Sequence, residues 1–215
     1  MKFGRDRTAY RKLLAEALAQ EPVSLFGYCL TSNHLHLLLH SESDAGMSRL
    51  MKTVAGQFAQ NYNRRKNRSG AYWGDRYHAT QIDGQQYLLN CLCYIDLNMV
   101  RAGVVPHPKE WDWCSYRELT GQRKRYCLVD VEALSQAIGD GASRESLAEN
   151  YVQMIQDRIE RDDLKRDASW SESLAVGSPT FVKRVAATLK NRIRTETHET
   201  QSGALCLRES PANYG

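Results

Sequence analysis

The stretch Thr31-Ser32-Asn33-His34-Leu35-His36-Leu37-Leu38-Leu39 joins a short polar segment to an apolar run that begins with two histidines. Side chains alternate between the faces of a β-strand, so His34 and His36 are expected on one face while the intervening leucines enter the core. The preceding residues 23–30 also have strand character, and residues 31–33 then form the turn of a β-hairpin. Two imidazoles at this spacing make half of a metal site. Alternatively, a buried histidine on an apolar strand is a hydrogen-bonded core residue.

A third ligand is expected some sixty residues downstream, between Asp83 and Asn98. Asp83 and Gln86 have the spacing of an N-cap and its capping-box partner, and no glycine or proline follows until Gly103. The pattern predicts a helix of about four turns. Tyr94 and Asn98 are four residues apart and therefore share a face of that helix, which offers a phenol as nucleophile and an amide oxygen as ligand. Alternatively, Tyr94 is a core aromatic and Asn98 a C-terminal cap.

Four motifs follow one another in an order that resembles a known family. They are Asn33-His34-Leu35-His36-Leu37-Leu38, Asn63-Arg64-Arg65 leading to Ser69-Gly70, Tyr94-Ile95-x-Leu97-Asn98-x-Val100-Arg101-Ala102-Gly103, and Trp113-Cys114-Ser115-Tyr116-Arg117. In this combination, over roughly residues 5–121, the chain resembles the REP-associated tyrosine transposases. These proteins are HUH-type (His-hydrophobic-His) single-tyrosine transposases of the insertion-sequence 200-like superfamily.

The resemblance implies an α+β fold with a ferredoxin-like palm, similar to an RNA-recognition fold, in which an antiparallel sheet has flanking helices. Helical periodicity over residues 10–18 and 44–63, and strand character over Tyr77–Ile82, fit that order. Compared with the palm, the chain lacks the first strand, so we expect an N-terminally truncated sequence. Tyr77–Ile82 or the alternating residues 203–207 are expected to fill the gap beside the histidine strand; otherwise the protein dimerises there or is marginally stable.

The same resemblance implies the chemistry of the site. Tyr94 is the nucleophile that attacks single-stranded DNA, becomes joined to a 5′-phosphate and releases a 3′-hydroxyl. His34, His36 and Asn98 would hold one divalent ion, Mg²⁺ or Mn²⁺, which orients the phosphate and stabilises the developing charge. The partner is expected to be single-stranded DNA with hairpin-forming repeats, and the process DNA transposition or the processing of palindromic repeats.

Basic and aromatic side chains interleave after the second predicted helix, and this combination suits a single strand whose bases stack on rings. The DNA-binding candidates are Arg64, Arg65, Lys66, Arg68, Tyr72 and Arg76. Alternatively, the charge run is a solvated loop. Residues 1–125 contain 18 Lys and Arg against 11 Asp and Glu, whereas residues 126–215 contain 11 against 14. The basic half is therefore the half with the motifs, which fits a polyanionic partner.

The whole chain is expected to divide into a transposase domain at residues 1–122 and a mostly helical region with a loosely ordered tail at residues 123–215. None of the six cysteines has C-x-x-C spacing, which favours buried free thiols in a reducing cytoplasm and argues against a cysteine zinc site. No apolar run approaches 18 residues, and the first residues lack a signal-peptide pattern. We therefore expect a cytoplasmic monomer or homodimer with no membrane association.

Two alternative functions remain open from the sequence. One is a DNA-binding domain that has lost catalysis. The other is a metal-dependent hydrolase that does not act on DNA, which would require an acidic or histidine-rich completion of the site. Only Asp83 and Asp96 lie near the motifs in sequence, so this second alternative has few ligands available to it.

Overall fold

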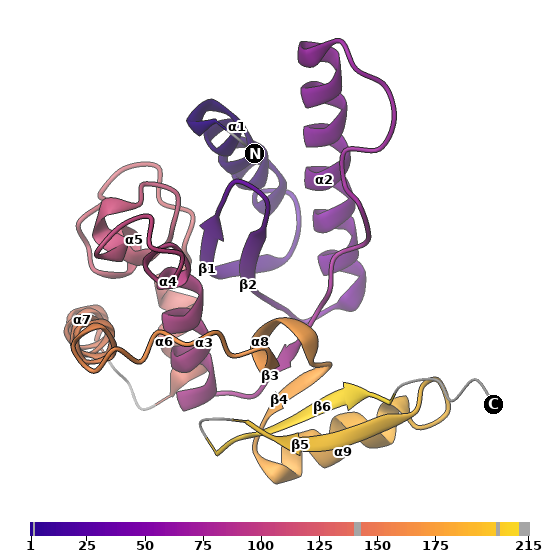
Figure 1. Ribbon diagram of the computed structural model, residues 1–215, viewed down its shortest axis with the longest axis vertical. Helices are drawn as coiled ribbons and strands as arrows, with labels where there is room; N and C mark the ends of the chain where they lie inside the picture. Colours follow the sequence, from indigo (N-terminus) through magenta and orange to yellow (C-terminus); the bar gives the residue numbers. More distant parts are fainter. Residues whose placement is uncertain (2, 140–142, 201–202, 211–215) are drawn as a thin grey trace.

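Figure 1 shows the computed structural model, which describes residues 1, 3–139, 143–200 and 203–210. The elements up to residue 119 are α1 (Gly4–Leu18), β1 (Val23–Leu30), β2 (Leu35–Ser41), α2 (Asp44–Lys66), β3 (Gln81–Ile82), α3 (Gln86–Asp96), α4 (Asn98–Arg101), the 3-10 helix η1 (Pro108–Glu110) and α5 (Tyr116–Leu119). Those that follow are α6 (Val131–Ile138), α7 (Arg144–Glu160), α8 (Ser169–Glu172), β4 (Ala175–Gly177), α9 (Pro179–Leu189), β5 (Thr195–Glu199) and β6 (Leu205–Glu209). The fold is α+β, as predicted.

The predicted hairpin forms from β1 and β2, which pair antiparallel with Leu30 opposite Leu35 beside the turn. The Thr31 N–H donates to the His34 carbonyl oxygen at 3.0 Å and closes that turn. On its other edge, β1 pairs with the segment around Ser115, whose N–H donates to the Tyr28 carbonyl oxygen at 2.9 Å. β1 is therefore an inner strand, whereas β2, which contains His36 and begins one residue after His34, is at the edge of this sheet.

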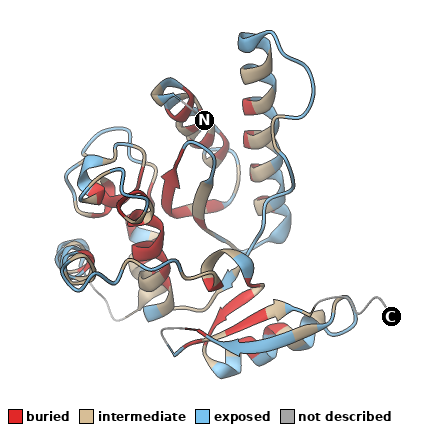
Figure 2. Cartoon of the chain, in the orientation of Figure 1, coloured by how far each residue is buried: buried red, intermediate tan, exposed pale blue. Residues whose placement is uncertain are grey.

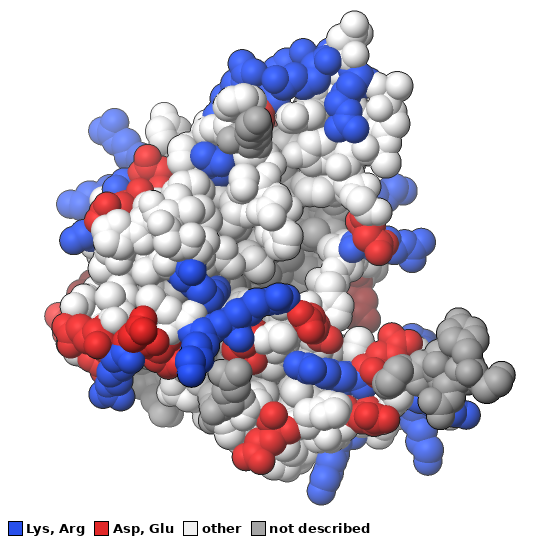
Figure 3. All heavy atoms as spheres, viewed as in Figure 1, with Lys and Arg blue, Asp and Glu red and all other residues white. Residues whose placement is uncertain are grey.

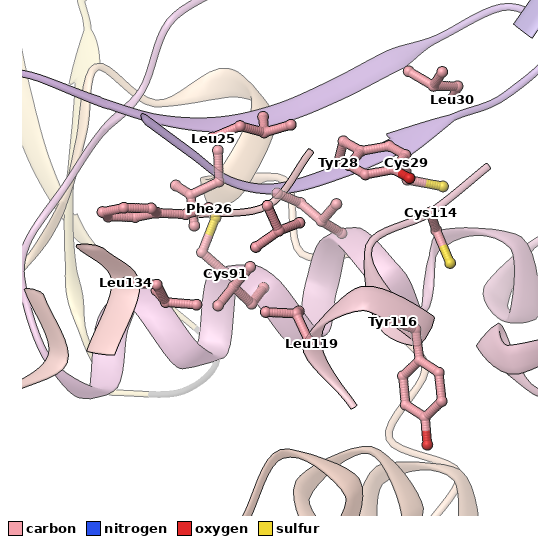
Figure 4. Packing of buried hydrophobic residues seen from close by; sticks show 14 of the residues in the cluster. Leu25, Phe26, Tyr28, Cys29, Leu30, Cys91, Cys114, Tyr116, Leu119 and Leu134 are labelled. Atoms are coloured by element: carbon pink, nitrogen blue, oxygen red, sulfur yellow. The ribbon is translucent and has the colours of Figure 1, made fainter. Parts of the chain in front are cut away.

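Helices cover both faces of the hairpin. Adjacent residues of β1 point to opposite faces, so Tyr28 contacts Arg11 of α1 while Gly27 faces Leu92 of α3. A Cβ atom at Gly27 would lie 2.4 Å from Leu92 Cδ2, so only glycine allows α3 to approach the strand this closely. Figure 2 shows that β1 and the facing part of α3 are largely buried, and Figure 4 shows the side chains that fill this core.

Neither segment expected to fill the gap beside the histidine strand does so. Only Gln81–Ile82 of the predicted strand is extended, and it pairs in parallel with β4. Residues 205–209 form β6, which pairs with β4 and β5. Both expectations were wrong because these segments build a second sheet of order β3-β4-β6-β5, where the fully buried β4 offers two edges. Helix α9 packs against this sheet (Figure 1).

The mostly helical character expected after residue 123 is confirmed by α6, α7 and α9, but the pattern missed strands β4 and β5 and assigned the alternating residues around β6 to the wrong partner. The core does not divide at the predicted boundary of residue 122. The Asp130 N–H donates to the Leu25 carbonyl oxygen at 2.8 Å, and Leu134 and Tyr151 belong to the same core cluster as β1. A separate cluster begins at Ala175. Residues 205–209 of the tail expected to be loosely ordered form a strand, and residues 211–215 lie outside the described part.

No helix in the described ranges combines the length and the hydrophobicity needed to cross a lipid bilayer.

Candidate active site

The segment that carries Tyr94 and Asn98 forms two helices rather than the one that the sequence predicts. Helix α3 ends at Asp96, and Leu97 separates it from the short helix α4, which begins at Asn98. The predicted N-cap at Asp83 was also wrong, because Gln85 with φ of 55° precedes the helix. The Asp83 carboxylate instead accepts hydrogen bonds from the Ser178 hydroxyl at 2.6 Å and N–H at 3.0 Å, which tether α9 to this segment.

Tyr94 lies against the histidine strand. Its ring is perpendicular to the His36 ring, with 6.3 Å between the ring centroids. On another side the ring of Trp170, from α8, lies 6.4 Å away. With these neighbours Tyr94 is only 6% exposed. The C-terminal region therefore contributes directly to the surroundings of the candidate nucleophile, a contact that no local pattern around Trp170 indicates.

The structure also brings the three predicted metal ligands together. His36 Nε2 lies 3.0 Å from Asn98 Nδ2, and the rings of His34 and His36 have centroids 6.4 Å apart. Among the described residues, no group of three or more His, Cys, Asp or Glu side chains could hold a metal ion. A metal at this site would therefore depend on the Asn98 amide.

The residues present fit such an ion in two respects. Burial, with smaller contributions from His34 and Arg101, lowers the pKa of His36 to about 4, so its imidazole is neutral near pH 7 and able to coordinate. The His36 and Asn98 side chains are also close together, with His36 Nε2 3.0 Å from Asn98 Nδ2, so the two could contribute to one ion. A rotation of the Asn98 amide by half a turn presents its oxygen, because nitrogen and oxygen differ only in assignment.

Asp96 fixes the end of the tyrosine helix from the side of the core. It is fully buried and accepts hydrogen bonds from the Ser115 hydroxyl at 2.7 Å and the Tyr151 hydroxyl at 2.8 Å. Burial raises its pKa to about 7, although these hydrogen bonds oppose the shift. Because Asp83 and Asp96 are both engaged in hydrogen bonds that join elements of the fold, they are poorly placed to complete the acidic site that a metal-dependent hydrolase would require.

The predicted DNA-binding side chains lie at the C-terminal end of α2 and in the loop that follows. Arg64 donates to Asn61 Oδ1 at 2.8 Å, Lys66 is exposed, and Arg68 donates to the Ala71 carbonyl oxygen at 3.2 Å. Figure 3 shows basic side chains gathered at this end of the molecule. A polyanion could reach these cations without disturbing the core.

Arg65 and Tyr72 contact side chains that pack inside the fold. Arg65 forms an ion pair with Asp6, which is fully buried, and so joins α2 to α1. The Tyr72 ring packs 4.6 Å from that of Tyr62, in an aromatic group on the inner side of the loop. Arg76 is exposed. Arg76 is therefore accessible with the cations of the loop, Arg65 combines a structural ion pair with a side chain that is 36% exposed, and Tyr72 has a packing role.

Glu118 and Arg101 are two residues to which the sequence assigned no role. Glu118 is 1% exposed and accepts hydrogen bonds from the Tyr28 hydroxyl at 2.6 Å and from Arg11 Nη2 at 2.9 Å. The Arg101 guanidinium lies over the Tyr94 ring, 4.2 Å from its centroid. Arg101 could have been suspected from its place one turn after Asn98, whereas Tyr28 and Arg11, the two partners of Glu118 named above, are ninety or more residues away from it in sequence.

Comparison with known proteins finds similar sequences. Residues 3–98 match the family model described as "Transposase IS200 like". A protein of Haemophilus influenzae named "Putative REP-associated tyrosine transposase" is 26% identical over 117 residues, which cover 50% of this chain and 66% of that relative, just under two thirds of its length. No solved structure matched the chain. Over residues 3–98, which include the histidine pair, Tyr94 and Asn98, the chain is therefore similar to the IS200-like transposases.

Proposed function

We propose that this protein is a metal-dependent transposase that nicks and rejoins single-stranded DNA through Tyr94. One observation carries the proposal: the Tyr94 ring lies against His36, while His36 is within 3.0 Å of the Asn98 amide. A phenol, two imidazoles and an amide thus converge from β2 with its preceding turn, α3 and α4. The proposed partner is single-stranded DNA that contains hairpin-forming repeats, and the proposed process is transposition or processing of such repeats.

The reaction exchanges one phosphodiester for another. Tyr94 Oη attacks the phosphorus, so an Oη–P bond forms and the bond from phosphorus to the 3′ oxygen breaks. The phenol loses its proton, and the leaving 3′ oxygen gains one. The product is a 5′-phosphotyrosine with a free 3′-hydroxyl. Because the aryl ester stays reactive towards a hydroxyl, a 3′-hydroxyl can reverse the step and rejoin DNA without ATP.

The protein side chains divide the work of the site. His34, His36 and Asn98 would hold Mg²⁺ or Mn²⁺, which when bound supplies positive charge beside the scissile phosphate. Asp96, with its two hydroxyl partners, holds the end of α3 that carries Tyr94. This preorganisation means that little rearrangement of α3 is needed when the phosphate binds.

Replacement of the tyrosine tests the proposal. The wild-type protein and Tyr94→Phe are incubated with Mn²⁺ and single-stranded hairpin oligonucleotides with randomised flanks, and denaturing gels detect protein–DNA adducts. We expect an adduct with the wild type and none with Tyr94→Phe, because the change removes the attacking oxygen and little packing. Tyr87→Phe, on the same helix, is the matched control and should form the adduct normally. An adduct with Tyr94→Phe would assign the nucleophile to another tyrosine.

One observation favours the alternative of a DNA-binding protein without cleavage activity. Tyr94 is only 6% exposed, so in this arrangement its hydroxyl is largely shielded from a DNA strand. The same experiment separates the two functions. Binding of the hairpin oligonucleotides by the wild type with no adduct in the presence of Mn²⁺ would support the alternative and contradict the proposed transesterification.

A further inference from the structure

Arg101 is held against the candidate nucleophile by two contacts. Its guanidinium lies over the Tyr94 ring, with Cζ 4.2 Å from the ring centroid. Its Nη2 donates a hydrogen bond to the Tyr94 backbone carbonyl oxygen at 3.0 Å. The side chain therefore folds back from α4 along the end of α3, beside the same tyrosine that His36 contacts on its strand side. A guanidinium has five N–H donors, so most of its hydrogen-bonding capacity is left for a ligand.

This positive charge has no carboxylate partner within the described part of the chain. Arg11, which is also shielded, pairs with Glu118. The buried Arg7 forms no ion pair among the described residues, but its guanidinium is enclosed by the Trp111 and Trp113 rings and donates to the Met1 carbonyl oxygen. The acid nearest to Arg101 in sequence, Asp96, is fully buried and directs its oxygens to Ser115 and Tyr151. A partly buried cation without a counter-charge is costly, which makes the position a natural site for an anion.

Further cations surround the same place. Burial lowers the pKa of Arg101, and the fields of Arg158 and Arg166 lower it further. Arg158, on α7, donates to the neutral Asn90 Oδ1 at 2.7 Å, so its charge is also not offset by that contact, whereas Arg166 pairs with Glu172. Figure 3 shows basic side chains across the middle of this face, where Figure 1 places α3 and α8. Clustered like charges repel one another until an anion binds.

We propose that Arg101 is the anion-binding residue of this site and holds a non-bridging oxygen of the phosphate that Tyr94 attacks. The chemical class of the ligand is a phosphodiester, and this identity rests on the proposed function, whereas the anion site itself rests on the contacts of Arg101. A guanidinium suits the role because its planar fork bonds two phosphate oxygens at once. While the Oη–P bond forms and the P–O3′ bond breaks, the non-bridging oxygens keep the negative charge that Arg101 balances.

Inorganic phosphate is the probe for the first test. It is titrated into full-length protein labelled with ¹⁵N-arginine, and the side-chain Nε–H signals are followed by NMR. We expect one signal, absent from Arg101→Gln, to shift as phosphate binds, and Arg101→Gln to bind phosphate about tenfold more weakly than the wild type. Arg49→Gln is the matched control, because Arg49 already pairs with Glu21 at 2.8 Å on α2, and its affinity should equal the wild type.

Arg101→Lys provides a second variant that keeps the charge, and it decides the question if Arg101→Gln does not fold. It should bind phosphate more weakly than the wild type, because an ammonium group cannot form the two parallel bonds of the fork. Wild-type affinity in the folded Arg101 variants, or no movement of the Arg101 signal in the wild type, would overturn the proposal. A packing role against Tyr94 alone predicts that outcome.

The second test uses DNA and keeps the two proposals distinguishable. An oligonucleotide that forms the Tyr94 adduct is prepared with a neutral methylphosphonate at the scissile position, and its binding to Tyr94→Phe is compared with binding to Tyr94→Phe/Arg101→Gln. Loss of Arg101 should weaken binding of the charged strand about tenfold and leave the neutral strand unchanged. Equal weakening of both strands would overturn the assignment. Phosphate binding that depends on Arg101, without any DNA adduct, would retain the anion site and remove the proposed function.

Discussion

Glu118 joins four parts of the fold, and its replacement by alanine should strongly destabilise the protein. The carboxylate is 1% exposed; one oxygen accepts hydrogen bonds from Tyr28 and Arg11, and the other accepts from the Val129 N–H at 2.9 Å. It therefore connects β1, α1, α5 and the segment before α6. Glu118→Ala leaves the Arg11 cation without its partner at a shielded position, which costs about 3–5 kcal/mol. Most domains have total stabilities of about 5–15 kcal/mol, so the variant should be close to unfolding.

Urea denaturation followed by circular dichroism measures this loss as a fall in the free energy of unfolding. Glu16→Ala on α1 is the matched control, because Glu16 is 52% exposed and lies 3.9 Å from Lys12 in a surface pair. Exposed pairs contribute about 0.2–1 kcal/mol, so the control should remain near the wild type. A loss below about 1 kcal/mol for Glu118→Ala would refute the reasoning, since it would mean that water or another group replaces the carboxylate at little cost.

Three further outcomes are expected. His36→Ala should abolish adduct formation and weaken Mn²⁺ binding measured by calorimetry, whereas His40→Ala should change neither, because His40 stacks on Phe26; an equal loss from both would indicate a structural histidine cluster. Charge reversal at Arg64 and Lys66 should weaken binding of every single-stranded sequence and flatten its salt dependence in anisotropy titrations; an unchanged slope would leave these cations as a solvated surface. Gly27→Ala should lower the free energy of unfolding by about 1–3 kcal/mol in thermal melts, and a neutral effect would show that α3 shifts freely.

The features predicted correctly from the sequence are those that local periodicity specifies. The alternation around His36 and the polar turn before it determine the hairpin. Tyr94 and Asn98 both lie beside His36, even though the helix that carries them is divided at Leu97. Both signals depend on residues within a few positions of one another. The geometry of the candidate site therefore followed from short stretches of sequence, once the fold had brought β2 and α3 together.

The features that were missed depend on contacts between distant residues. Residues 203–207 alternate as a strand should, but alternation does not specify a partner, and β4 rather than β2 provides the pairing edge. Arg65 stands in a run of cations, yet the buried Asp6 gives it a structural ion pair that the charge pattern alone could not reveal. Such partners can be identified only when the packing of α1 against α2 is known.

The side chains around Tyr94 come from inside and outside the segment that matches the family model. Residues 3–98 include the tyrosine, the histidines and the amide. The ring that lies beside Tyr94 is Trp170, and Asp96 receives its hydrogen bond from Tyr151. Both contacts come from outside the matched segment, so the orientation and burial of the candidate nucleophile are determined partly by α7 and α8. Relatives that share the motifs but differ in these two helices would present the tyrosine differently to a DNA strand.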